Sequence, residues 1–481
     1  MTGLEIYKLL PKTNCKKCGY PTCLAFAMAL AARKTEFGKC PDISDEARQK
    51  LSDSSRPPIK MIVLPDPSAS SSGSDDADIK IGGETVLFRH EKTFFNPCGL
   101  GVYLSDAFSS GDIEDILSAV ARLRFERVGK IEKTEFVFIE NKNPAVPALF
   151  LQDAVRKSLD IGLVPVVSSY SPAIVEKIAG SLPAGKKIIV AAKHDDDDSS
   201  FKDYVTLCAR YGLPIALECA SLDDCAASSA KVLELTDGKF DEIIFLLKPD
   251  TPYMSFEILV QTRRLAIKKN FRPLGYPVMT FTTLAAFLSR ESDGQEDRRR
   301  RIIGDSDIFE ESAEAAQYIE KYASVIILSS WRPEEHLALV SLRQNIYADP
   351  RKPVSVEARL YAIGYPTEKS PLLVTTNFSL TYYSVVPEIE SSKVPCHLLV
   401  VDTEGMSVLT AWAADKFSPE IIKEAMEKNK VSEVISHRKI IIPGYVAVIA
   451  EKLSRLTGFE VVAGPKEVSG LPKFLKEFSV S

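Results

Sequence analysis

Short apolar runs alternate with longer amphipathic segments through the middle of the chain, from about Gly82 to Asp349. The runs are almost continuously apolar, which is typical of parallel strands covered on both faces, and the segments between them have helical spacing. Eight such strand–helix units predict a (β/α)8 barrel. The runs are TVLF at Thr85, FVFIE at Phe136, PVVSSY at Pro165, KIIVAA at Lys187, PIALEC at Pro214, EIIFLL at Glu242, PVMTFT at Pro277 and SVIILSS at Ser324.

Three charged residues stand where predicted strands of this barrel end, namely Glu140, Glu218 and Lys248. The active sites of such barrels lie at the carboxyl ends of the strands. The three residues fit two interpretations about equally well, as catalytic groups or as structural polar groups of the barrel mouth. A lone histidine after the last run, His336, is typical of a helix surface.

The last region, from Ser370 to Ser481, repeats a strand–helix pattern three times. LLVTTN precedes SLTYYSVVPEIE, HLLVVDTEG precedes MSVLTAWAADKF, and KIIIPG precedes YVAVIAEKL. Each strand ends in Thr, Asn or Gly, which puts hydroxyls and backbone N–H groups along the edge where doubly wound folds bind ligands. The same residue types also cap helices without binding a ligand. The pattern predicts an α/β unit with a candidate binding edge.

Four of the nine cysteines lie near the start of the chain in the spacing C-x2-C-x4-C-x16-C, as Cys15, Cys18, Cys23 and Cys40. The chain opens without the features of a secretion signal, so we expect a cytoplasmic protein whose reduced thiols bind metal. Structural zinc sites usually pair two short knuckles, whereas here three cysteines lie together and the fourth follows a predicted helix. That asymmetry favours a [4Fe–4S] cluster, with zinc as the alternative.

The composition is that of an ordinary globular protein, with 45% apolar and 26% charged residues in 481. A net charge of −5 without a long basic tract argues against nucleic acid as a ligand. No segment has the ~20 apolar residues of a membrane span. Within residues 59–80 the tract LPDPSASSSGSDDADIK is rich in Ser, Asp and Pro, which predicts a flexible linker.

Five stretches resemble, in order, the large subunit of the corrinoid iron–sulfur protein of the acetyl-CoA synthase and CO dehydrogenase system. They are LLPKTNCKKCGYPTC, GGETVLFRHEKTFFNP, TTNFSLTYY, DTEGMSV and IIPGYVA. The resemblance implies a small iron–sulfur domain over residues 1–58, a TIM barrel over 81–350, and a Rossmann-like α/β corrinoid-binding domain over 366–481. The flexible linker would then separate the first two domains.

The resemblance also implies which residues hold the cofactors. The cluster ligands of the family match the four cysteines without a gap. Among the corrinoid contacts, Thr376 is an alternative to Thr375. The corrinoid contacts fall on Thr375, Thr381, Gly405, Met406, Ser407, Val408 and Val468. No histidine of the chain lies in the D-x-H-x-x-G motif with which many corrinoid proteins ligate cobalt, so we expect a base-off cobamide without a protein ligand. The histidines are His90, His194, His336, His397 and His437.

The function implied by the resemblance is methyl transfer. A methyl-tetrahydropterin gives its methyl group, through a methyltransferase, to Co(I) of the corrinoid, which passes it to acetyl-CoA synthase/CO dehydrogenase, and the cluster reduces any Co(II) that forms. A smaller corrinoid iron–sulfur subunit would complete a heterodimer. A second hypothesis is an iron–sulfur electron-transfer or activator protein whose C-terminal domain only docks partners. A third, weaker one is a barrel methyltransferase that binds the pterin itself.

Overall fold

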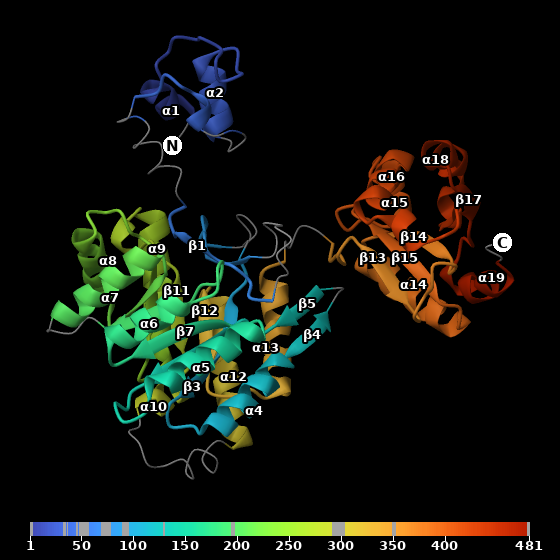
Figure 1. Ribbon diagram of the computed structural model, residues 1–481. Helices are drawn as coiled ribbons and strands as arrows, with labels where there is room; N and C mark the ends of the chain where they lie inside the picture. The colour runs from blue at the N-terminus through green and yellow to red at the C-terminus, as the bar shows by residue number, and fades with distance from the viewer. Residues whose placement is uncertain are drawn as a thin grey trace. The chain divides into compact units, whose positions relative to one another are not determined.

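The computed structural model describes residues 3–31, 35, 37–44, 47, 57–68, 78–88, 96–127, 130–193, 198–290, 304–348 and 353–478. By their contacts the residues form two units, one of 1–123 and 134–346 and the other of 124–133 and 347–481. Figure 1 shows a barrel in the first unit and an open sheet flanked by helices in the second. The middle of the predicted linker, 69–77, lies outside the described residues, as do His90 and His194.

Eight parallel strands close into a barrel in chain order, and helices surround them, which confirms the predicted (β/α)8 fold (Figure 1). The last strand closes onto the first. The strands are β3 Gly99–Ser105, β6 Phe136–Asn141, β7 Val164–Ser169, β8 Ile189–Lys193, β9 Ile215–Glu218, β10 Ile243–Leu247, β11 Val278–Phe281 and β12 Val325–Leu328. The helices are α4 Ser110–Ala121, α5 Ala148–Asp160, α6 Pro172–Ser181, α7 Asp198–Tyr211, α8 Leu222–Leu235, α9 Pro252–Lys268, α10 Thr283–Arg290, α12 Asp305–Glu320 and α13 Pro333–Ile346.

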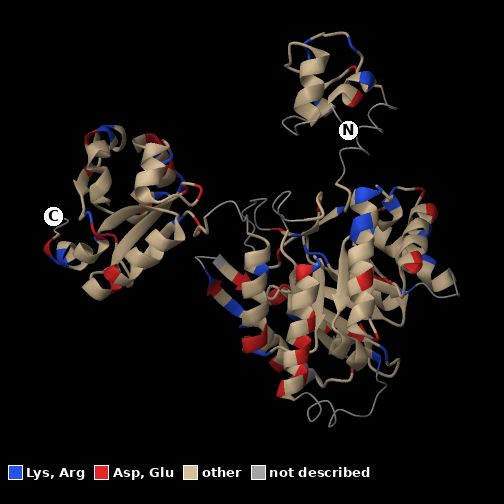
Figure 2. Ribbon diagram, turned by 180° about the vertical axis from the view of Figure 1, so that it is seen from behind, with Lys and Arg blue, Asp and Glu red and all other residues tan. Residues whose placement is uncertain are grey.

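Alternate residues of the strands fill the barrel, because successive side chains of a strand point to opposite faces. Phe138 and Phe281 meet edge to face inside it, with ring centroids 4.8 Å apart, and neither is exposed. Figure 2 shows the matching distribution of charge, with Lys, Arg, Asp and Glu on helices and loops and almost none along the barrel strands. No helix in the described ranges is long and apolar enough to cross a membrane.

The first barrel strand is not the predicted run at Thr85, which has no strand over residues 85–88. It is β3, whose sequence GLGVYLS is interrupted by two glycines and so lacks a continuous apolar run. The glycines are needed because the neighbouring strand lies close. A Cβ on Gly99 or on Gly101 would come within 2.3 or 2.9 Å of Phe136. That prediction was therefore wrong, and packing against an aromatic ring is the reason.

A two-stranded antiparallel hairpin, β1 Met61–Leu64 with β2 Ile79–Gly82, lies within and beside the predicted linker. The N–H of Lys60 donates to the carbonyl of Gly275, shortly before β11, so the hairpin lies at the amino-terminal end of the barrel. Its inward side chains are at most 1% exposed and extend the barrel core. They are Ile62, Leu64 and Ile81. The structure thus differs from a flexible linker over these two strands, because their buried apolar side chains pack against the barrel core.

The second unit contains a five-stranded sheet in the order β13-β15-β14-β16-β17, in which β13 is an antiparallel edge and the other four strands are parallel. All three predicted strand–helix pairs are present. The strands are β13 Leu360–Ile363, β14 Leu372–Thr376, β15 Cys396–Val401, β16 Lys439–Ile442 and β17 Glu460–Ala463, with a separate hairpin of β4 Arg124–Arg127 and β5 Lys130–Lys133. The helices are α14 Ser379–Ser392, α15 Val408–Ala413, α16 Pro419–Lys428, α17 Val431–Val434, η4 Gly444–Ile449, α18 Ala450–Thr457, η5 Val468–Gly470 and α19 Leu471–Glu477.

Helices cover both faces of this sheet, and each face has its own apolar core (Figure 1). Leu372 and Val374 of β14 belong to one core and Leu373 to the other, as in a strand buried on both sides. β14 pairs with β15 at five positions but with β16 at one, where Leu373 lies opposite Ile441. The chain order reverses across β14, and at such a switch point α/β sheets open a crevice beside the strand carboxyl ends.

Candidate functional site

The cysteine-rich start of the chain folds as two short helices joined by a tight loop. Thr22 caps the second helix, because its hydroxyl accepts a hydrogen bond from the N–H of Ala25 at 3.0 Å. The N–H of Cys23 donates to Oδ1 of Asn14 at 2.8 Å, and positive φ angles at Asn14 and Gly19 let the loop between them turn sharply. The elements are α1 Gly3–Leu9, α2 Cys23–Ala31 and η1 Phe37–Lys39.

Three of the four predicted cluster ligands lie in or against the small core of this region. Cys23 and Cys40 are buried in it, Cys18 packs against it, and Cys15 is exposed. Burial raises the pKa of the Cys40 thiol, and the charges of Cys18, Cys15 and Cys23 raise it further. No three His, Cys, Asp or Glu side chains in the described residues are arranged around one ion. A [4Fe–4S] cluster takes one thiolate on each iron, and the region offers four cysteines.

A cavity of about 280 Å³ opens at the switch point, beside the carboxyl ends of β14 and β16. Its deeper wall is apolar and comes from the sheet and the helices on one face. Its rim comes from α14 and from the loops that follow β15, β16 and β17. The apolar residues of the deeper wall include Leu373, Val385, Leu398, Ile441 and Leu471. A pocket with an apolar wall and a polar rim is the usual form of a cofactor site.

Most of the residues predicted to contact a corrinoid lie together around this cavity. Gly405 and Met406 do not line it, and they hold the loop after β15 instead. Gly405 has φ +75°, and a Cβ there would come within 2.7 Å of a backbone oxygen of Pro353. Met406 packs against one of the two cores of the sheet. The predicted residues that line the cavity are Thr375, Thr381, Ser407, Val408 and Val468.

Thr375 and Thr376 are both buried, and neither hydroxyl has a hydrogen-bond partner in the protein. Only Thr375 lines the cavity. Adjacent residues of a strand point to opposite faces, so a register shift of one residue would aim the wrong hydroxyl. A buried hydroxyl without a partner costs about 1–3 kcal/mol, which a ligand in the cavity would recover by bonding to it. Thr375 therefore fits the predicted contact better than Thr376.

Two loops of the rim contain a Pro-Gly or Gly-Pro pair, Pro443-Gly444 after β16 and Gly464-Pro465 after β17, and the predicted strand end KIIIPG and the predicted contact Val468 lie in or next to them. Gly444, after β16, lies so close to the loop after β17 that a Cβ would come within 2.4 Å of the carbonyl oxygen of Gly464. At the rim the hydroxyl of Tyr445 donates to Glu467 at 2.5 Å. The close approach of the two loops was not predicted, because it joins backbone atoms of residues that lie far apart in the sequence.

The described histidines have other partners and none lines the cavity. Nε2 of His397 lies 3.1 Å from the carbonyl of Thr367, and Nε2 of His437 lies 2.9 Å from that of Ser370. His336 is fully buried between Thr134 and a backbone carbonyl, and burial lowers its pKa to about 4. The expectation that His336 lies on a helix surface was wrong, because its ring satisfies two buried groups of the barrel.

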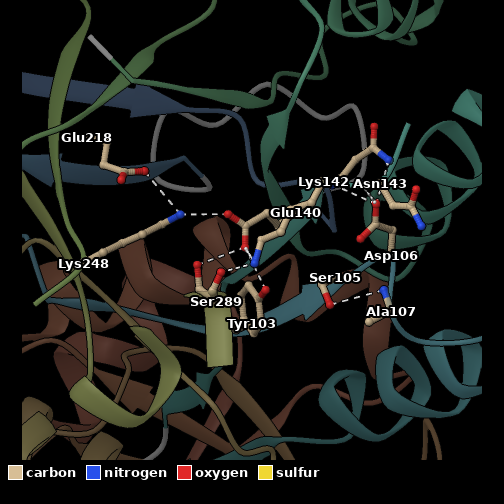
Figure 3. Close-up of polar contacts among 11 residues, drawn as sticks. Tyr103, Ser105, Asp106, Ala107, Glu140, Lys142, Asn143, Glu218, Lys248 and Ser289 are labelled. Atoms are coloured by element: carbon tan, nitrogen blue, oxygen red, sulfur yellow. Dashed lines mark hydrogen bonds and ion pairs between the residues drawn. The ribbon is translucent and has the colours of Figure 1, made fainter. Parts of the chain in front are cut away.

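The charged residues at the barrel mouth pair with one another (Figure 3). Nζ of Lys248 lies 2.8 Å from Glu140 and 3.3 Å from Glu218, and it also lies over the rings of Phe138 and Phe281 at 5.5 and 5.4 Å. Burial disfavours the ammonium, but the two carboxylates outweigh burial and raise the pKa of Lys248. This lysine stays charged, which does not suit a nucleophilic amine.

Glu140 is 5% exposed and has partners on both oxygens. The hydroxyls of Tyr103 and Ser289 donate to one oxygen at 2.7 and 3.0 Å, and the ammonium of Lys142 lies 3.3 Å away (Figure 3). Burial opposes ionisation of this carboxyl, yet Lys248 and Lys142 lower its pKa overall. A carboxylate already bonded on all sides favours the structural interpretation of the barrel mouth over the catalytic one.

Comparisons with known proteins cover both regions. A family model described as "CO dehydrogenase/acetyl-CoA synthase delta subunit" matches residues 71–475, and one described as "Putative Fe-S cluster" matches 10–41. The chain is 37% identical to the corrinoid/iron-sulfur protein large subunit of Moorella thermoacetica, over 99% of this chain and 98% of that protein. It is 31% identical to the acetyl-CoA decarbonylase/synthase complex subunit gamma of Methanopyrus kandleri, with coverage of 99% and 98%.

Among solved structures, a dihydropteroate synthase of Yersinia pestis aligns with 52% of this chain and 94% of its own, with a TM-score of 0.34 and 10% identity. The sequence relatives, by contrast, match the chain almost from end to end, and they confirm the resemblance drawn from the five stretches. The chain therefore belongs to the CO dehydrogenase/acetyl-CoA synthase subunit family that includes the corrinoid/iron-sulfur protein large subunits and the acetyl-CoA decarbonylase/synthase gamma subunits.

Proposed function

We propose that the chain is a corrinoid methyl carrier with its own activating iron–sulfur cluster. The observation that carries the proposal is the cavity at the switch point, where the unpartnered hydroxyl of Thr375 lies among Thr381, Ser407, Val408 and Val468. The names of the relatives, which join a corrinoid to an iron–sulfur protein, support both cofactors. The methyl group would come from a methyl-tetrahydropterin through a methyltransferase and go to acetyl-CoA synthase.

A corrinoid bound at this edge would supply cobalt as the group that accepts and releases the methyl. The chain's own residues have simpler tasks. The hydroxyls of Thr375, Thr381 and Ser407 would bond to amides of the corrin rim, and the apolar wall would receive its hydrocarbon parts. The proposed cofactor is base-off and has no protein ligand on cobalt. On this proposal residues 366–481 are a Rossmann-like corrinoid-binding domain.

The four cysteines would hold a [4Fe–4S] cluster in the domain proposed for residues 1–58, and its chemistry is the supply of single low-potential electrons. Cys15 is exposed and Cys18 partly so, which would leave one edge of the cluster accessible to an electron donor or acceptor. Cys23 and Cys40 in the core would anchor the opposite edge. The cluster's proposed task is to return the oxidised corrinoid to its methyl-accepting state.

The proposed partners are a smaller corrinoid iron–sulfur subunit in a heterodimer, a methyl-tetrahydropterin methyltransferase, and acetyl-CoA synthase/CO dehydrogenase. The relatives' names as subunits of a complex support partnership of this kind. A cavity of about 280 Å³ encloses only part of a molecule as large as a corrinoid, so this chain leaves much of the macrocycle uncovered. Leu380 and Tyr383 on α14 are 67% and 48% exposed and offer apolar surface for a covering subunit.

The alternative is an electron-transfer or activator protein whose C-terminal domain only docks partners. A docking surface does not need an apolar cavity that contains a buried, unpartnered hydroxyl, so the cavity favours the methyl carrier. Cobalt analysis and visible absorption of the protein purified anaerobically with its partners distinguish the two. The carrier should contain about one corrinoid per chain, and the activator should contain the cluster alone.

The two adjacent threonines provide a matched test of the cavity. Thr375→Val keeps the shape of the side chain but removes the hydroxyl that lines the cavity, so we expect corrinoid to dissociate roughly tenfold faster. Thr376→Val removes an equally buried hydroxyl that does not line it, so retention should stay at the wild-type level. Stopped-flow or dialysis with visible detection measures both rates. Equal retention in the two variants, or a defect only in Thr376→Val, would contradict the proposed site.

A further inference from the structure

Asn377 follows β14 directly and is 4% exposed, and every polar atom of its side chain is bonded. Its Oδ1 accepts three hydrogen bonds, each 3.0 Å long, from N–H and Oγ1 of Thr403 and from the N–H of Gly405. Its Nδ2 donates to Oδ1 of Asp402 at 2.9 Å. The four bonds join the end of β14 to the loop that follows β15. The backbone bonds between β14 and β15 end with the N–H of Asn377, which donates to the carbonyl of Val401 at 2.9 Å, and the side chain of Asn377 continues the connection into the loop.

The loop that Asn377 holds has an unfavourable backbone. Glu404 has φ 56°, a strained conformation for a residue with a Cβ, whereas the φ of 75° at the next position is open to Gly405. A further bond supports the same turn, from the N–H of Glu404 to Oδ1 of Asp402 at 3.0 Å. The loop then leads into Ser407 and Val408, which line the cavity opposite Thr375.

We propose that Asn377 is a positioning residue of the cavity, which it shapes without lining it. Its amide is the one side chain of suitable length that offers both an oxygen for three donors and an N–H for Asp402. It thereby fixes the distance between the hydroxyl of Thr375 on β14 and the wall formed by Ser407 and Val408. The inference rests on the proposed function only in taking the ligand of the cavity to be a corrinoid.

An exchange of the two side chains tests this role. Asn377→Asp keeps the acceptor but puts two carboxylates side by side, so it should open the loop. Asp402→Asn keeps an acceptor for Asn377 and should behave like the wild type. The double variant Asn377→Asp/Asp402→Asn restores a donor–acceptor pair in the opposite sense and should recover most of the loss. Asn345→Asp, at an exposed position of α13, controls for the added charge.

Two readouts are made on the full chain with its partner subunits. The first is the rate of corrinoid release by visible absorption, which should rise roughly tenfold or more in Asn377→Asp, as for a buried group left next to a like charge. The second is amide hydrogen exchange of residues 402–408 in corrinoid-free protein, which should accelerate in the same variant and slow again in the double variant. The cluster's iron content should not change in any of them.

The outcomes separate the two proposals. If the wild-type protein holds no corrinoid, the proposed function fails, but exchange of residues 402–408 still decides whether Asn377 positions the loop. Wild-type exchange and release in Asn377→Asp would overturn the positioning role. A double variant no better than Asn377→Asp would also overturn it, because the role requires a donor–acceptor pair and no particular identity at either position.

Discussion

A Cys23→Ala variant should lose its iron and acid-labile sulfide almost completely and still hold its corrinoid. The thiol is buried in the small core that also contains Cys40, so no other described cysteine can take its place without unfolding that core. The corrinoid should remain because the cavity lies in the second unit, which has separate apolar cores. The expected functional consequence is selective. The protein should accept a methyl group when reduced chemically, and it should fail to recover after oxidation.

Iron, sulfide and cobalt analysis of protein prepared anaerobically measures the effect, and Cys98→Ala is the matched control. Cys98 is as buried as Cys23 but lies at the start of the barrel, where burial raises the pKa of its thiol and keeps it unreactive. That variant should keep both cofactors. Zinc without sulfide in the wild-type protein, or simultaneous loss of cobalt in Cys23→Ala, would contradict the assignment.

Lys248→Met should destabilise the barrel by about 3–5 kcal/mol, as expected when one partner of a buried ion pair is removed. The ammonium is the nearest counter-charge of Glu140, which is 5% exposed, and Lys142 at 3.3 Å only partly replaces it. Methionine keeps most of the length of the lysine stem between the rings of Phe138 and Phe281. The loss should therefore come from the carboxylate left behind, whose pKa should rise.

Denaturant unfolding of the barrel, followed by far-UV circular dichroism, measures this change. A Glu140→Gln/Lys248→Met double variant leaves no charge unpaired and should regain most of the stability, since neutral replacement of a buried pair is often tolerated. Lys239→Met removes a lysine that is 82% exposed and should change stability by less than about 0.5 kcal/mol. If the single and double variants are equally unstable, packing and not charge holds the barrel mouth together.

The barrel was predictable because most of its strands are continuous apolar runs, a pattern that depends on local sequence alone. β3 was not predictable, since its two glycines make room for Phe136 on the neighbouring strand. A contact between strands does not show in the local sequence. The hairpin of β1 and β2 was hidden for a related reason. Each strand has four residues, too few for a clear strand pattern, and their apolar side chains are buried only because they pack against the end of the barrel.

The cavity was partly predictable in the same sense. Hydroxyl residues at strand ends and the family resemblance indicated Thr375, Thr381 and Ser407, because their chemistry shows in the sequence. The choice between Thr375 and Thr376 needed the direction of each side chain. Asn377 lies in the stretch TTNF, whose residue types fit either a binding edge or a helix cap. Its role could not be predicted, since its partners lie 25 or more residues away in the loop after β15.

Between β14 and β16 the C-terminal sheet has one paired position, fewer than between its other neighbouring strands. β13, β15 and β14 form one continuous ladder, and β16 and β17 form a second. The two ladders meet between β14 and β16. The cavity lies across this junction, with Thr375 at the end of β14 and Pro443 just after β16. A ligand bound there would contact both ladders, so we expect occupancy of the site to slow amide hydrogen exchange on the two sides of this junction together.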